Sequence, residues 1–123
     1  MQNTLIDVPI WVSNLDIDTK EISSVAKDLF IKHPAKHELE RGDAQSSYGL
    51  TNEIGSYAEF DKLRELVIEN VKEYWGVYGL DARKEPEIHH SRMNRHGKGG
   101  STFPHFHSQT PIAGVFYIQF KEG

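Results

Sequence analysis

A glycine-rich turn leads into two histidines in the stretch Gly99-Gly100-Ser101-Thr102-Phe103-Pro104-His105-Phe106-His107. An apolar run over residues 112–118 follows and is typical of a β-strand. Successive side chains of a strand point to opposite faces, so we expect His105 and His107 on the same face. Neutral imidazole is the commonest protein ligand for first-row transition metals. The spacing therefore predicts a metal chelate that takes its third ligand from elsewhere.

The composition is that of an ordinary globular domain. The chain has 123 residues, of which 37% are hydrophobic and 26% charged, which predicts a single domain over residues 1–123. It has no cysteine, so imidazole and carboxylate are the strong metal ligands available. A net charge of -4 argues against nonspecific binding to nucleic acid. Because the apolar segments are too short to cross a membrane and no signal-peptide pattern is present, we expect a cytoplasmic protein.

Two amphipathic helices are predicted. Residues 18–21 have the spacing of a capping box, and helically spaced apolar residues follow as far as Phe30. Residues 56–59 repeat the signature, and the helical spacing continues until Gly79, a typical stop. The aromatic residues near the end of the second helix have a spacing that favours core packing over stacking on bases or sugars: Tyr74, Trp75 and Tyr78.

Strands are predicted at both ends of the chain. An opening strand is expected over Leu5–Val12. Two more are expected over Ile88–Arg95 and Ile112–Phe120, separated by a glycine-rich turn at residues 97–100. The segment between the two helices, residues 32–54, reads as an irregular loop that has room for a short strand. This order of elements predicts an α+β domain with N-terminal helices packed on a sheet.

The most apolar predicted strand, Ile112–Phe120, is nearly the last segment of the sequence. Such a strand would leave a long exposed edge, which natural proteins generally avoid. Two expectations follow. Either a partner covers the edge, for example in a homo-oligomer, or the chain is the N-terminal part of a longer domain.

Taken alone, His-x-His fits a metal chelate and two unrelated polar side chains about equally well. Its surroundings carry a resemblance. The order Ser91-Arg92-Met93-Asn94, then His105-Phe106-His107, then Ala-Gly-Val-Phe-Tyr-Ile at residues 113–118 is similar to the Ser-Trp-x-Asn, His-x-His and Ser-Gly-Val-Tyr-Tyr of a family of 2-oxoglutarate and iron(II) oxygenases common in marine phages and bacteria. The stretch from Arg95 to His107 also resembles the corresponding segment of prolyl-hydroxylase-like oxygenases. The resemblance implies a partial double-stranded β-helix, of the jelly-roll or cupin-like type, below the N-terminal helices.

The resemblance also implies roles for individual residues. His105 and His107 would bind iron(II), with 2-oxoglutarate as cosubstrate of a hydroxylase-type dioxygenase. Asn94 and Tyr117 would contact the cosubstrate or the substrate. A strand hydrogen bond for Asn94 and core packing for Tyr117 are the alternatives that we favour. The substrate, a small molecule or a peptide, is not readable from the sequence.

The sequence departs from the family at several positions. Arg92 stands in place of tryptophan and Ala113 in place of serine, and His107 occupies the position of a carboxylate in the wider superfamily. Family members continue with further strands that carry a distal histidine and a basic residue for the carboxylate of 2-oxoglutarate. The resemblance therefore implies that residues 1–123 are the N-terminal part of an oxygenase domain and lack a complete site.

Two other interpretations stay open. Gly99, His105 and His107 reproduce the opening of the cupin metal motif, but the glutamate expected a few residues later is absent. The second alternative is a nonenzymatic β-module that pairs with another chain through its exposed strand.

The other histidines are weaker candidates. His89 and His90 are expected on opposite faces of a strand, so at most one can face a given site. His33 and His37 have a spacing that suits chelation on a helix, but Pro34 lies between them.

Overall fold

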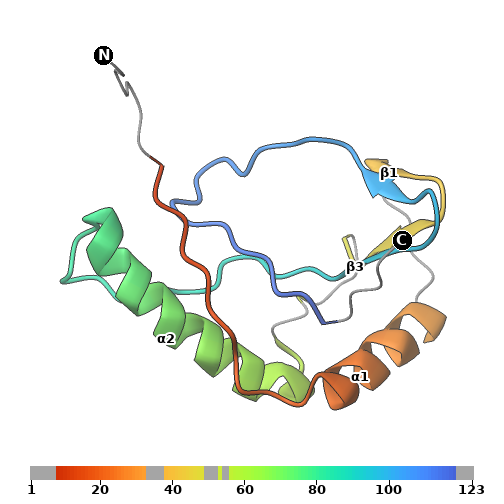
Figure 1. Ribbon diagram of the computed structural model, residues 1–123, viewed down its shortest axis with the longest axis horizontal. Helices are drawn as coiled ribbons and strands as arrows, with labels where there is room; N and C mark the ends of the chain where they lie inside the picture. Colours follow the sequence, from red (N-terminus) through yellow and green to blue (C-terminus); the bar gives the residue numbers. More distant parts are fainter. Residues whose placement is uncertain (1–7, 33–37, 49–52, 54–55, 119–123) are drawn as a thin grey trace.

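A computed structural model describes residues 8–32, 38–48, 53 and 56–118 of the chain. It confirms the α+β class: two helices form the lower layer of Figure 1, and short antiparallel sheets with irregular connections lie above them. The elements in chain order are α1 (Thr19–Lys32), β1 (Glu40–Arg41), β2 (Ala44–Ser46), the 3-10 helix η2 (Ala58–Phe60), α2 (Asp61–Tyr78), β3 (Asn94–His96) and β4 (Ser101–Thr102). No helix within the described ranges is long and apolar enough to cross a membrane.

Helix α1 begins as the capping pattern predicts. The Oδ1 atom of Asp18 accepts a hydrogen bond of 2.8 Å from the backbone N–H of Lys20, which satisfies one free donor of the first turn. Its inner face carries the helically spaced residues Ile22, Leu29 and Phe30, and all three are buried. The local signal was therefore sufficient to place this helix.

The second helix has the predicted end but not the predicted cap. Gly79 adopts a left-handed φ of 74°, and its N–H bonds the carbonyl oxygen of Gly76. At the other end, the hydroxyl of Ser56 donates to the carbonyl oxygen of Glu53 at 2.7 Å instead of capping a helix. A turn of 3-10 helix, η2, precedes α2, and neither start has a side-chain cap.

Core packing of the α2 aromatic residues was a wrong prediction, because α2 has no buried residue. The hydroxyl of Tyr74 donates to the carbonyl oxygen of Pro9, and its ring centroid lies 6.3 Å from that of Trp11. The Trp11 indole N–H in turn donates to Oδ1 of Asn70 at 3.1 Å. Side chains of α2 thus hold the N-terminal segment along the helix, while Tyr78 stays exposed.

The same contacts explain why the opening strand is absent. Residues 8–12 are described and form no strand, so that part of the prediction for Leu5–Val12 was wrong, and residues 5–7 lie outside the described part. The segment packs on a helix and not beside another strand. A period-two apolar pattern does not distinguish these two environments.

The loop between the helices contributes to a β-ribbon. Strand β1 pairs with β4 and strand β2 with β3, both antiparallel. The N–H of Phe103 donates to the carbonyl oxygen of Leu39 at 2.9 Å, and that of Ser47 donates to the carbonyl oxygen of Met93 at 2.9 Å. These bonds extend both ladders at their outer ends. The two short sheets are therefore the two halves of one interrupted antiparallel ribbon.

Glycines permit the two turns that interrupt the ribbon between its two ladders. Gly42, with a φ of 64°, lies against the turn of residues 97–100. A Cβ on Gly42 would overlap the carbonyl oxygen of Gly99, and one on Gly100 would overlap that of Asp43. The N–H of Gly100 closes the turn on the carbonyl oxygen of Gly97 at 3.0 Å. The predicted glycine-rich turn is confirmed, and close backbone approach is the reason for its composition.

The strands predicted beside this turn are shorter or missing. Of Ile88–Arg95, only the last two residues lie in β3, and β3 continues to His96. Residues 112–118 form no strand, and residues 119–120 lie outside the described part. Their side chains nevertheless alternate, because Ile112, Phe116 and Ile118 are half-buried whereas those between them are exposed. The strand predicted over Ile112–Phe120 is therefore absent from residues 112–118, although the exposure of their side chains has a strand-like alternation.

The core is small and lies between α1, η2 and the ribbon. Its buried cluster consists of Ile22, Leu29, Phe30, Phe60 and Met93. The chain exposes 10011 Å², whereas a compact monomer of this mass exposes about 6,700 Å². Much apolar surface, including the outer sides of residues 8–12 and 112–118, is therefore uncovered.

Candidate metal centre

The ribbon positions the two histidines of the predicted chelate. Residues 103–107 leave β4, and the Phe103 N–H bond to Leu39 fixes the start of this segment. The guanidinium of Arg41 lies 4.1 Å from the centre of the Phe103 ring and holds it from the other side. Beyond Pro104, His105 and His107 are exposed.

The two imidazoles lie side by side, although residues 103–107 do not form the strand from which this placement was predicted. Their ring centroids are 5.0 Å apart, with an edge-to-face angle of 71°. A zinc–imidazole bond of about 2.1 Å puts each ring centroid about 3.2 Å from the ion, so that two rings on one ion lie about 4.6–5.3 Å apart. The observed separation lies within this range, which overlaps that of an ordinary edge-to-face ring contact. The ring spacing is thus compatible with chelation of one ion.

A backbone contact selects the nitrogen of His105 that can bind the metal. Its Nδ1 lies 2.9 Å from the carbonyl oxygen of Phe103. A carbonyl only accepts, so Nδ1 carries the proton and donates, which leaves the lone pair on Nε2. Outer hydrogen bonds of this kind orient the histidine ligands of metal sites.

The described part of the chain supplies no third ligand. Within residues 8–32, 38–48, 53 and 56–118, no group of three histidine, cysteine, aspartate or glutamate side chains is placed to hold a metal ion. His33 and His37 lie outside these ranges. The donor set seen at the site is therefore two imidazoles.

The two residues predicted to contact the cosubstrate lie elsewhere on the ribbon and on the last segment. Asn94 begins β3, pairs with Ser46 and is exposed. Tyr117 is 73% exposed, so its alternative role in core packing was wrong. In the described part, no hydrogen bond or ring contact connects Asn94 or Tyr117 with either histidine of the chelate.

The adjacent histidines upstream differ from expectation. His89 and His90 do not point to opposite faces, because residues 88–93 are not in a strand and the two rings stack with centroids 4.4 Å apart. Nδ1 of His90 lies 3.2 Å from Oε1 of Glu53, whose Oε2 accepts the N–H of Ser91 at 2.7 Å. No spacing in the sequence indicates this contact, because Glu53 and His90 are 37 positions apart.

Charge and hydrogen bonding around Glu53 shift its acidity. Burial raises the pKa of the carboxyl, but the Ser91 amide, His90 and the charge of Arg92 together lower the pKa below its ordinary value. The Arg92 guanidinium itself stacks on Tyr48, 3.8 Å from the ring centre. This cluster joins the segment before β3 to the loop after β2.

A second polar cluster lies on the ribbon beside the turn. Nε2 of His96 lies 2.8 Å from the hydroxyl oxygen of Thr102, and that hydroxyl donates to Oε1 of Glu40 at 3.4 Å. Glu40 is buried. The contacts connect β3, β4 and β1 and therefore support the fold of the ribbon below the histidine pair.

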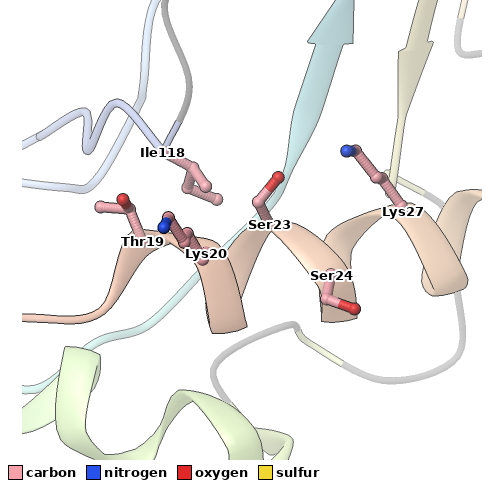
Figure 2. Close-up of a pocket in the computed structure, with 6 residues that line it drawn as sticks. All are labelled: Thr19, Lys20, Ser23, Ser24, Lys27 and Ile118. Atoms are coloured by element: carbon pink, nitrogen blue, oxygen red, sulfur yellow. The ribbon is translucent and has the colours of Figure 1, made fainter.

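One hollow of about 340 Å³ lies on α1, as Figure 2 shows. Lys20, Ser23 and Lys27 point to the same side of the helix, toward Ile118, whereas Ser24 points away. The carboxylate of Asp18 already occupies the free N–H of Lys20 at this end of α1. No motif in the sequence marks this surface, and the spacing of Lys20 and Lys27 on one helix face is the signal that could indicate it.

Comparison with known proteins finds no match to the sequence among family models, curated proteins or solved structures.

Proposed function

We propose that this chain carries the metal-binding part of an iron(II) and 2-oxoglutarate-dependent oxygenase. The observation that carries the proposal is the exposed His105–His107 pair, with ring centroids 5.0 Å apart and Nε2 of His105 available for a metal. The sequence resemblance supplies the metal and the cosubstrate. When bound, iron(II) and 2-oxoglutarate would supply the activation of oxygen for hydroxylation of a substrate.

The residues of the chain have separate tasks in this proposal. His105 and His107 bind the ion, and the Phe103 carbonyl orients the first of them. Asn94 and Tyr117 contact the cosubstrate or the substrate. The folded ribbon of β1 to β4 forms part of a double-stranded β-helix in this proposal. Its turns at residues 42–43 and 97–100 bring β4 and the histidines to one end of the sheet.

An anaerobic titration tests the proposal. Iron(II) and 2-oxoglutarate are added to the chain, and the visible charge-transfer band of the chelated cosubstrate is recorded. We expect a band that is lost in His105→Ala and in His107→Ala. His89→Ala is the matched control, because it removes an exposed histidine elsewhere and should leave the band unchanged. The band requires a third ligand beyond His105 and His107, so a folded chain without a band contradicts the proposal for residues 1–123 alone.

A second candidate function has one observation in its favour. Ala113, Val115 and Tyr117 are exposed on one side of a segment with strand-like alternation. Such a segment is able to pair with a strand of another chain, including a second copy of this one. Pairing would be independent of metal. Val115→Lys should abolish it, and unchanged association of this variant would exclude the segment as the contact.

A further inference from the structure

The part of the chain that the structure describes provides too few ligands for a stable metal centre. Structural zinc sites in proteins have four protein ligands, and catalytic ones have three. His105 and His107 are two, and no third histidine, cysteine or carboxylate joins them in the described ranges. The missing ligands must therefore come from another molecule or from residues outside these ranges.

The placement of the pair favours another molecule. Both side chains are exposed, and they follow the ribbon on a surface segment. The backbone contact of His105 leaves its Nε2 available for an ion. An ion held by this pair would thus keep its remaining coordination positions open to solvent and to any ligand that approaches from there.

We propose that one divalent metal ion is bound between two copies of this chain, each of which contributes His105 and His107. The second copy presents the same pair with the same 5.0 Å separation, so a two-fold axis through the ion brings four imidazoles together. Four imidazoles around one ion suit Zn²⁺ and Co²⁺, which accept nitrogen ligands in tetrahedral geometry. The inference rests on the metal-binding half of the proposed function and not on its oxygen chemistry.

The net negative charge of the chain favours a divalent cation at the contact between two copies. Each chain has a net charge of -4, so two copies repel each other at long range. Neutral imidazoles leave the full charge of the divalent ion in place, and this charge offsets part of the repulsion. Association should therefore require the ion, and a chelator should reverse it.

The test measures the mass of the full chain by light scattering during a Zn²⁺ titration. We expect the mass of one chain without metal and the mass of two chains once one ion per two chains has been added. EDTA should restore the lower mass. With Co²⁺ in place of Zn²⁺, the visible absorption of tetrahedral cobalt should rise with the same stoichiometry.

Five single-histidine variants decide where the ion binds. His105→Ala and His107→Ala should each abolish the doubling, and His89→Ala should retain it. One ion per chain with no change in mass would overturn the inference, and so would a doubling that survives the first two substitutions. If His33→Ala or His37→Ala abolishes metal binding to a chain that keeps the lower mass, the ligands are from one copy and the inference is likewise wrong.

The outcome is separable from that of the oxygenase proposal. Doubling with Zn²⁺ but no charge-transfer band with iron(II) and 2-oxoglutarate supports the shared ion and contradicts the oxygenase. A charge-transfer band from single chains that each bind one iron supports the oxygenase and contradicts the shared ion.

Discussion

Nδ1 of His105 lies 2.9 Å from the carbonyl oxygen of Phe103, two residues earlier in the chain. This contact determines which nitrogen faces a metal, and it exists before any metal is added. One of the two proposed ligands, His105, is therefore already oriented for metal binding in the metal-free chain.

The first prediction concerns this tautomer. In long-range ¹H–¹⁵N spectra of the metal-free chain at neutral pH, His105 should carry its proton on Nδ1, and Zn²⁺ should shift the Nε2 resonance most. His105→Ala should weaken zinc binding by about 100-fold or more, since even loss of an outer partner of a ligand costs about 10–100-fold. A proton on Nε2 in the metal-free chain would contradict the assignment.

The second prediction concerns the turn that folds the ribbon. Gly42→Ala places a side chain at a φ of 64° and against the carbonyl oxygen of Gly99. The backbone conformation alone costs about 1–2 kcal/mol, and the overlap adds to it, so we expect a loss of about 3 kcal/mol in the free energy of unfolding. Urea denaturation followed by circular dichroism measures it.

Gly76→Ala is the control for that substitution. Gly76 lies inside α2, and a Cβ there meets nothing within 4 Å. Alanine has the higher helix propensity, so this variant should gain about 0.5–1 kcal/mol. Equal effects at the two glycines would mean that the contact between the two turns contributes nothing to stability.

Features that depend on interactions between residues close in sequence were predicted correctly, whereas features that depend on distant residues were not. Helix α1 depends on neighbours three and four residues apart, so its period and the Asp18 cap were sufficient to predict it. The same-side placement of His105 and His107 is also local. Strand pairing depends on distant segments, and for this reason residues 8–12 and 112–118 have a strand-like pattern without a ladder.

Side-chain environments were the least predictable feature. The alternation of residues 112–118 shows that Phe116 and Tyr117 face opposite ways, but not which of them faces the core. The core-packing alternative for Tyr117 chose the wrong side. Likewise, the contact between Glu53 and His90 joins residues 37 positions apart, which no spacing rule connects.

The third prediction follows from that contact. The pKa of Glu53 is lower in the folded chain than its ordinary value of 4.5, because the Ser91 amide, His90 and Arg92 outweigh burial. Its ionised form therefore stabilises the fold above pH 4.5, and this stabilisation is lost as the pH falls through the lower, folded pKa. The effect should be small, since the Glu53 side chain is 47% exposed and solvent screens its partners.

Denaturation curves of the parent chain and of Glu53→Gln, measured from neutral pH into acid, check this dependence. The parent should be the more stable at neutral pH, and the difference should shrink below pH 4.5. Glu59→Gln, at an exposed position outside this cluster, is the control and should give a smaller difference. A difference that grows in acid would give the wrong sign for the proposed cause.

The last prediction compares one substitution in two environments. Phe60 is 3% exposed and belongs to the core cluster between α1 and the segment before β3, whereas Phe106 is 87% exposed between the two histidines. Phe60→Ala should cost about 3–5 kcal/mol, since it removes a buried ring and leaves a cavity. That loss approaches the whole stability of a small domain, so Phe60→Leu, at about 1.5 kcal/mol or less, keeps the test measurable if the first variant unfolds. Phe106→Ala should change stability by no more than about 0.5 kcal/mol. A stability cost at Phe106 that matches the cost at Phe60 would mean that another surface covers the Phe106 ring in solution. If that surface belongs to a second copy, the cost of Phe106→Ala should diminish when the protein is diluted.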